Sequence, residues 1–220
     1  IAKGETKGVL TEEVIASINR SAQYVQEIVD AGKVVYGINT GFGPLCTSLI
    51  GANDTKKLQE NILKSHAVGV GEPIDVELSK LMLILKVQAL AKGFSGVQLT
   101  TVERIIWHIE NDVIPVVPKQ GSVGASGDLA PLSHLFLPLI GLGKVWYEGK
   151  ICATQDVLNK YGMEAIHLGA KEGLALINGT QFMAAYGVKI VDRQVDEEKK
   201  ICHATAIMPK SQIQPKPASN

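Results

Sequence analysis

Helical spacing of apolar residues recurs along most of the chain and constrains its fold more than any other feature. Between Thr11 and Gly32, apolar residues at 14, 18, 25, 28 and 29 fall on one face of a helix. Thr11 is suited to cap a first turn that holds Glu12 and Glu13, and Gly32 is suited to end the helix. The sequence therefore predicts a helix between these two residues.

Further helices are predicted where this periodicity returns: at 74–93, at IIWHI and the residues before it, at 129–142, at QDVLNKYG, and from 171 to about 200. Thr100 and Glu103 have the spacing of a capping box at the start of the second of these. Pro138 should kink or end the third. NGT at 178–180 interrupts the last.

A strand pattern is clear in one short segment, KVWYEGKICA at 144–153, which predicts a small hairpin turning at Glu148 and Gly149. Long loops are expected at 33–53 and 113–128. The predicted fold class is therefore mainly α, with long loops and one small hairpin.

The helical pattern weakens after Asp192. VDEEKK is a run of charges, and the final residues hold three prolines and little apolar content. We expect a folded region over residues 1–195 and a charged, flexible tail over 196–220.

Charge and composition disfavour several function classes. Lys plus Arg and Asp plus Glu both number 22, so no net positive charge would attract nucleic acid or an anionic membrane surface. No apolar run approaches the roughly 18 residues that a membrane span requires. The three cysteines, 46, 152 and 202, are widely spaced, and the histidines lack metal-ligand spacing. We expect a cytoplasmic protein that binds no metal, nucleic acid or membrane.

The glycine-rich stretch GSVGASGDLAP, at 121–131, is the strongest candidate for chemistry. It lacks the Lys-Ser/Thr of a P-loop, which makes nucleotide binding a weak hypothesis, and the G-x-S-x-G spacing of a nucleophile elbow. One interpretation is a tight loop in which Asp128 caps the next helix. The other interpretation is backbone cyclisation. The Gly127 amide nitrogen attacks the carbonyl of Ala125, which a small side chain leaves accessible, and Ser126 loses its hydroxyl by elimination.

GSVGASGDLAPLSH resembles the signature of the aromatic amino acid ammonia-lyases, in which Ala-Ser-Gly becomes 4-methylidene-imidazol-5-one, MIO. Four further blocks resemble the family in the expected order: VYGINTGFGPL, LQENILKSHAVGVGEP, LAKGFSGVQ and KEGLALINGTQ. The resemblance covers roughly residues 8 to 192. It implies the helical N-terminal part of the ammonia-lyase fold, MIO made from Ala125, Ser126 and Gly127 with no other cofactor, and a homotetramer.

The same resemblance implies roles for single residues. Tyr36 matches the base that removes the substrate's β proton, for which its phenol would need N–H donors or a positive neighbour. Asn178 is similar to the asparagine that binds near the substrate carboxylate. Asp128 and nearby backbone donors would polarise the ring. Gln181 would orient its neighbours, and Asn39 would help shape the loop beside Tyr36.

Ser65 and His66 bear on the substrate. At this pair the phenylalanine lyases carry Phe-Leu and the tyrosine lyases His-Leu, whereas Ser-His resembles the histidine-specific members. A site built to hydrogen-bond an imidazole rejects analogues that leave its polar group unpaired. The resemblance thus implies L-histidine as substrate and urocanate and ammonia as products.

Three alternatives stay open at this point. A tyrosine or phenylalanine lyase, or an aminomutase, would share the same electrophile. Family members are much longer, and their blocks with a second tyrosine, a carboxylate-binding arginine and a glutamate have no match here, nor does the chain begin with Met. We therefore expect a partial chain, whose alternative role is that of a structural or assembly piece without activity of its own.

Overall fold

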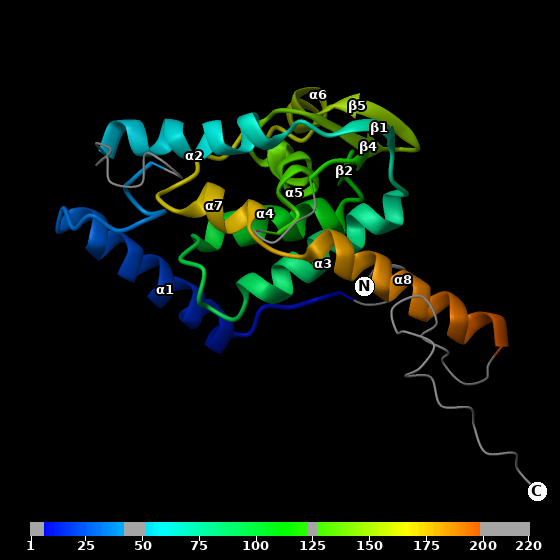
Figure 1. Ribbon diagram of the computed structural model, residues 1–220, viewed down its shortest axis with the longest axis horizontal. Helices are drawn as coiled ribbons and strands as arrows, with labels where there is room; N and C mark the ends of the chain where they lie inside the picture. The colour runs from blue at the N-terminus through cyan, green and yellow to red at the C-terminus, as the bar shows by residue number, and fades with distance from the viewer. Residues whose placement is uncertain (1–6, 42–51, 123–126, 199–220) are drawn as a thin grey trace, which may run out of the picture.

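The computed structural model describes residues 7–41, 52–122 and 127–198, and these form a mainly helical body with two small sheets (Figure 1). The helices are α1 Glu12–Asp30, α2 Ala52–His66, α3 Val76–Leu90, α4 Leu99–Glu110, α5 Leu129–Phe136, α6 Thr154–Lys160, α7 Glu172–Ile177, α8 Gln181–Glu198 and the 3-10 helix η2 Leu137–Ile140. The strands are β1 Val70–Pro73, β2 Ile114–Pro115, β3 Pro118–Gln120, β4 Lys144–Tyr147 and β5 Lys150–Ala153. The mainly α prediction is confirmed.

Local sequence signals explain several helix boundaries. Thr11 caps α1, because its Oγ1 accepts a hydrogen bond from the N–H of Val14 at 3.4 Å. Helix α5 ends at Phe136, and Pro138 lies in the 3-10 turn that follows, as predicted. Helix α8 continues to Glu198, three residues beyond the boundary expected at 195.

The start of α4 differs from the prediction. The helix begins at Leu99, so Thr100 lies inside its first turn and the capping box with Glu103 is wrong. Instead, the start of α4 is capped by Glu172, a residue distant in the sequence. Its Oε1 accepts from the N–H of Gln98 at 2.8 Å and from the hydroxyl of Thr101 at 2.7 Å. A contact across 74 residues has therefore replaced the local motif.

The predicted hairpin is confirmed, with Tyr147 paired to Lys150 across a turn in which Glu148 and Gly149 have φ values of 50° and 75°. Two short strands lie in the segment expected to be a loop at 113–128. Strand β2 pairs with β4 and extends the hairpin to three strands, and β3 pairs with β1. These pairings are non-local, so the strands carry little sequence signal of their own.

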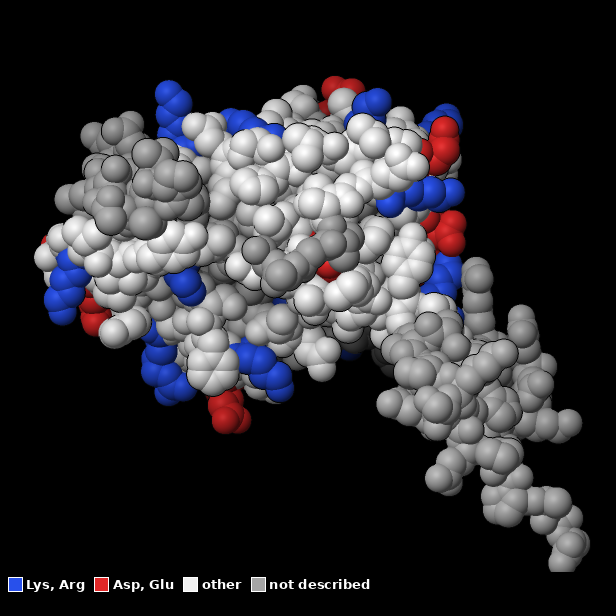
Figure 2. Space-filling view, in the orientation of Figure 1, with Lys and Arg blue, Asp and Glu red and all other residues white. Residues whose placement is uncertain are grey.

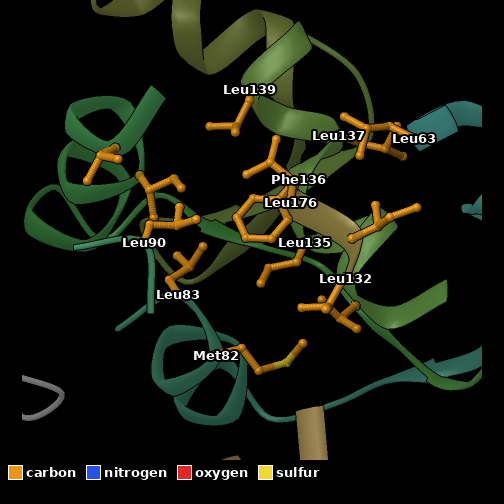
Figure 3. Packing of buried hydrophobic residues seen from close by; sticks show 14 of the residues in the cluster. Leu63, Met82, Leu83, Leu90, Leu132, Leu135, Phe136, Leu137, Leu139 and Leu176 are labelled. Carbon is orange, nitrogen blue, oxygen red and sulfur yellow. The ribbon is translucent and has the colours of Figure 1, made fainter. Parts of the chain in front are cut away.

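Helix α3 lies at the centre of the body and packs against both α4 and α8, while α2 packs against α5 and α7 (Figure 1). Figure 3 shows side chains from these elements meeting around the ring of Phe136, among them Leu83 and Leu90 from α3, Leu63 from α2 and Leu176 from α7. The core thus joins the helices that carry the candidate site residues.

Candidate functional site

Helix α7 is short, but the segments predicted to hold site residues meet around it. Gly173 in this helix donates its N–H to Oε1 of the buried Gln59 of α2 at 2.9 Å. A Cβ on Gly173 would lie 2.5 Å from the Gln59 carbonyl oxygen, so only glycine allows this close approach. The block KEGLALINGTQ is therefore packed directly on the block that carries Ser65 and His66.

The loop with Tyr36 is held by Asn39. Oδ1 of Asn39 accepts from the N–H of Val35 at 3.0 Å, and its Nδ2 donates to the carbonyl of Lys33 at 2.7 Å. Asn39 is buried, whereas Tyr36 is 58% exposed. Gly37 lies against Leu174, which places the loop on α7. Asn39 thus shapes this loop, and its contact with substrate stays a prediction.

His66 is oriented by its own helix. Its Nδ1 lies 2.9 Å from the carbonyl oxygen of Ile62 and 3.0 Å from the hydroxyl of Ser65, which itself donates to Ile62 at 3.2 Å. A carbonyl only accepts, so the geometry favours a proton on Nδ1 and leaves Nε2 of the neutral ring as an acceptor. Such a ring can accept a hydrogen bond from an N–H of a bound molecule.

The end of α2 is tied to α5 by another histidine. Nε2 of His134 accepts from the N–H of Gly69 at 2.9 Å, and burial lowers the pKa of this imidazole. A neutral ring suits an acceptor of this kind. His134 therefore fixes the segment that follows His66, which is a structural role.

Gly127 is the one described member of the Ala125-Ser126-Gly127 triplet, since residues 123–126 lie outside the described residues. It has a φ of +109°, and a Cβ there would lie 2.6 Å from the carbonyl oxygen of Gly179. The next residue, Asp128, donates its N–H to that same oxygen at 2.7 Å. The triplet's C-terminal end is therefore fixed against the turn that follows α7.

Asp128 was predicted, in one interpretation, to cap the helix that follows it. It does occupy the N-cap position of α5, but its side chain makes no capping hydrogen bond there. Instead its Oδ2 accepts from the N–H groups of Phe182 and Met183, at 2.8 and 3.2 Å, in the first turn of α8. The prediction that the Asp128 side chain caps α5 is therefore wrong, because the carboxylate accepts hydrogen bonds from α8 and makes none to its own helix.

Lys86 lies at the same junction and carries no sequence motif. It is 2% exposed, and its ammonium donates to the carbonyl oxygen of Asn178 at 3.0 Å. Burial lowers the pKa of Lys86 to about 7, against the opposing effect of the Asp128 carboxylate. The one signal that could have drawn attention to it is a lysine in the middle of the apolar run LMLILKVQAL.

Asn178 and Gln181 flank this turn. Asn178 is exposed at the C-terminal end of α7, with its main-chain N–H donating to Leu174 at 3.0 Å. Gln181 is the first residue of α8, and its buried Oε1 has no hydrogen-bond partner among the described residues. A buried acceptor without a partner is costly, and it marks a place where a donor fits.

Residues 1–208 match the family described as aromatic amino acid lyase. The chain belongs to this family. Its blocks meet at α7 and the turn after it, which contact the Tyr36 loop at Gly37, α2 at Gln59 and the Ala-Ser-Gly stretch at Gly127.

Two curated relatives of this chain are histidine ammonia-lyases. The one from Shouchella clausii is 52% identical over 185 residues, which cover 83% of this chain and 37% of the relative. The one from Streptococcus pyogenes serotype M3 is 44% identical over 178 residues, covering 81% of this chain and 35% of the relative. The chain thus spans little more than a third of the length of these relatives.

Solved structures agree with the fold. Histidine ammonia-lyase from Trypanosoma cruzi has a TM-score of 0.79 at 41% identity, over 88% of this chain and 37% of that one. Tyrosine aminomutase from Streptomyces globisporus has a TM-score of 0.82 at 33% identity, over 89% and 37%. The similarity therefore extends to family members with different named activities.

Other parts of the described chain offer less. The described residues contain no group of three side chains suited to a metal, and no described helix is long and apolar enough to cross a membrane. A cavity of about 670 Å³ lies between residues 7–10, α3 and α4, and none of the predicted site residues lines it. On the face in Figure 2, charged side chains lie mostly near the edges.

Proposed function

We propose that this chain is the electrophile-bearing portion of a histidine ammonia-lyase, which eliminates ammonia from L-histidine to give urocanate. The observation that carries the proposal is the Gly127–Gly179 contact, which joins the Ala-Ser-Gly stretch to the block with Asn178. The histidine assignment rests on the Ser65-His66 pair and on relatives named histidine ammonia-lyase at 44% and 52% identity.

The surroundings of Gly127 support a cyclised Ala125-Ser126-Gly127. Gly127 has a backbone conformation that L side chains rarely adopt, and it packs on main-chain atoms of Gly179. Beside that turn, Gln181 has a buried Oε1 without a hydrogen-bond partner in the part of the chain that the structure describes. Asp128 donates its N–H to Gly179, and its carboxylate accepts from two N–H groups at the start of α8. These bonds hold the residue next to Gly127 in one place. When formed, the MIO ring supplies an electrophilic carbon that accepts the substrate amine and makes it a better leaving group.

The chain's own residues then perform binding and proton transfer. Nε2 of His66 accepts a hydrogen bond from the substrate imidazole, because Nδ1 is already turned to Ile62. Asn178 binds near the substrate carboxylate, with Gln181 orienting its neighbours. Tyr36, whose side chain is exposed on the loop that Asn39 holds in shape, removes the β proton of the substrate. Asp128 and nearby backbone donors would polarise the MIO ring.

Intact-protein mass tests the first step of this proposal. Ring closure removes two waters, so the wild-type chain should be lighter by that amount, and Ser126→Ala should keep its full mass. A wild-type chain of full mass, from which an ordinary Ser126 peptide is recovered, would contradict the proposal.

Substrate choice is tested by comparing the deamination of L-histidine, L-tyrosine and L-phenylalanine. We expect L-histidine to be preferred, and His66→Leu to reduce kcat/KM for it by about 100-fold or more, since the imidazole loses its partner. A preference for L-tyrosine or L-phenylalanine would favour the other named activities of the family. If the chain forms the ring but makes no urocanate, a role as an assembly piece is favoured.

Partners follow from the same proposal. We expect a homotetramer in the cytoplasm, with L-histidine as the small-molecule partner and neither nucleic acid nor membrane involved. Helix α8 supports an oligomer, because Met183, Val188 and Val191 are each more than a third exposed on one side of it. Sedimentation velocity measures this state directly, and a monomer at all concentrations would contradict it.

A further inference from the structure

A buried ammonium at the junction of α3, α7 and α8 is not explained by packing. Lys86 is among the largest fully buried side chains, on a helix whose other buried side chains are mostly apolar. Burying a charged group is unfavourable unless it is paired and hydrogen-bonded. The position must therefore be judged by what the ammonium contacts.

Its contacts are specific. Nζ donates to the main-chain carbonyl of Asn178 at 3.0 Å and lies 5.9 Å from the centre of the Phe136 ring. Met82 and Leu90, one turn away on either side of Lys86, are buried apolar residues of the core. The ammonium is thus aimed at one backbone oxygen from a rigid helix.

That oxygen belongs to the turn against which Gly127 packs. Gly179, the next residue, supplies the carbonyl that accepts from the Asp128 N–H, and its main chain lies against Gly127. Two contacts therefore connect Lys86 to the end of the Ala-Ser-Gly stretch. A charge-assisted hydrogen bond is stronger than a neutral one, so the protonated form of Lys86 is well suited to hold the Asn178 carbonyl in place.

We propose that Lys86 is a positioning residue that fixes the Asn178–Gly179 turn by donating to the Asn178 carbonyl, and through that turn holds Gly127 in place for ring closure. The last step rests on the proposed function. The first concerns the turn alone and holds whether or not the ring forms.

Amide hydrogen exchange tests the turn. The Asp128 N–H remains after ring closure, and it reports the hydrogen bond to Gly179 in either state. Lys86→Met keeps a long, buried side chain without the donor, and we expect exchange at Asp128 and at the amides of 178–183 to become about tenfold faster relative to the rest of the core. Lys86→Arg, which keeps charge and donors, should restore part of the protection.

Lys80→Met is the matched control, because Lys80 lies on the same helix but pairs with Asp112. It should leave exchange at these amides unchanged. The inference is overturned if Lys86→Met leaves their exchange unchanged, or if Lys80→Met accelerates it equally. If Lys86→Met does not fold, Lys86→Leu, which is shorter and also lacks a donor, decides by the same criterion.

Intact mass adds a second readout. We expect a smaller fraction of Lys86→Met than of wild type to have lost two waters after the same folding time. A full-mass wild-type chain would count against the proposed function and not against Lys86, which the exchange comparison decides independently. Faster exchange at the turn with unchanged ring closure would remove the second half of the inference.

Discussion

Several buried ionisable side chains among the described residues make their hydrogen bonds chiefly to backbone groups. His108 is the clearest example: it is 1% exposed, its Nδ1 lies 2.8 Å from the carbonyl oxygen of Val113, and burial lowers its pKa to about 4. The proton on Nδ1 connects α4 to the start of β2, so the ring is structural in its neutral form.

Acid should destabilise the protein through His108. Its pKa falls from 6.5 to about 4 on folding, so between these pH values the unfolded chain binds a proton that the folded chain does not. The free energy of unfolding should therefore decrease as pH falls through this window, by up to about 1.4 kcal/mol per unit. Denaturant titrations of His108→Gln should lack this share of the slope, while His167→Gln, at an exposed site, should keep it.

The buried Lys86 should affect the pH dependence of stability on the alkaline side. Its pKa is about 7 in the folded chain and 10.5 when unfolded, so the unfolded state binds more protons between these values. The free energy of unfolding of wild type, relative to Lys86→Met, should rise with pH from about 7 to about 10, by up to about 1.4 kcal/mol per unit. A difference that stays constant across this range would show that Lys86 is not desolvated.

At the scale of elements, α7 organises the site although it has only six residues. A helix this short is not stable alone, so its position is set by contacts with α2, with the Tyr36 loop and, through Glu172, with α4. The buried carboxyl of Glu172 also accepts from the N–H of Gly169 at 2.6 Å, and burial raises its pKa. Changes at α7 should therefore reach several site residues at once.

Gly173→Ala tests the contact between α7 and α2. Helix propensity alone would favour alanine by up to about 1 kcal/mol. The added Cβ, however, would lie 2.5 Å from the Gln59 carbonyl, so we expect a net loss of about 1–3 kcal/mol in the free energy of unfolding. Chemical denaturation measures this change, and an unchanged or increased stability would contradict the close packing.

At the scale of the whole molecule, α8 has two different sides. Its buried side packs on α3, where Lys189 pairs with Asp75 and Glu77 of the α3 start. The other side exposes Met183, Val188 and Val191, with exposed fractions of 52%, 43% and 39%. Apolar residues gathered on one helix face indicate a surface that another protein segment covers.

Association should therefore weaken when this face becomes polar. Replacing Met183, Val188 and Val191 together with glutamine preserves helix propensity and should raise the dissociation constant at least about tenfold, as sedimentation velocity would measure. Ile151→Gln, at an exposed apolar residue of the hairpin, should leave association unchanged. Equal effects of both changes would indicate non-specific association.

Features decided by neighbours in sequence were predictable. Thr11 caps α1, Glu148 and Gly149 form the hairpin turn, and the helix before Pro138 ends, because each depends on a few consecutive residues. The order of the five blocks that resemble the family similarly indicated the family, which the match over residues 1–208 confirms.

Tertiary structure alone decided which partners these groups take. Glu172 replaced Thr100 at the start of α4, Asp128 turned from its own helix to α8, and Lys86 reached Asn178 across 92 positions. In each case a buried polar group takes a partner that is distant in the sequence, because burial penalises any polar group left without one. The sequence thus determined the family and most of the helices, although not α2, whereas packing determined how the candidate site is held together.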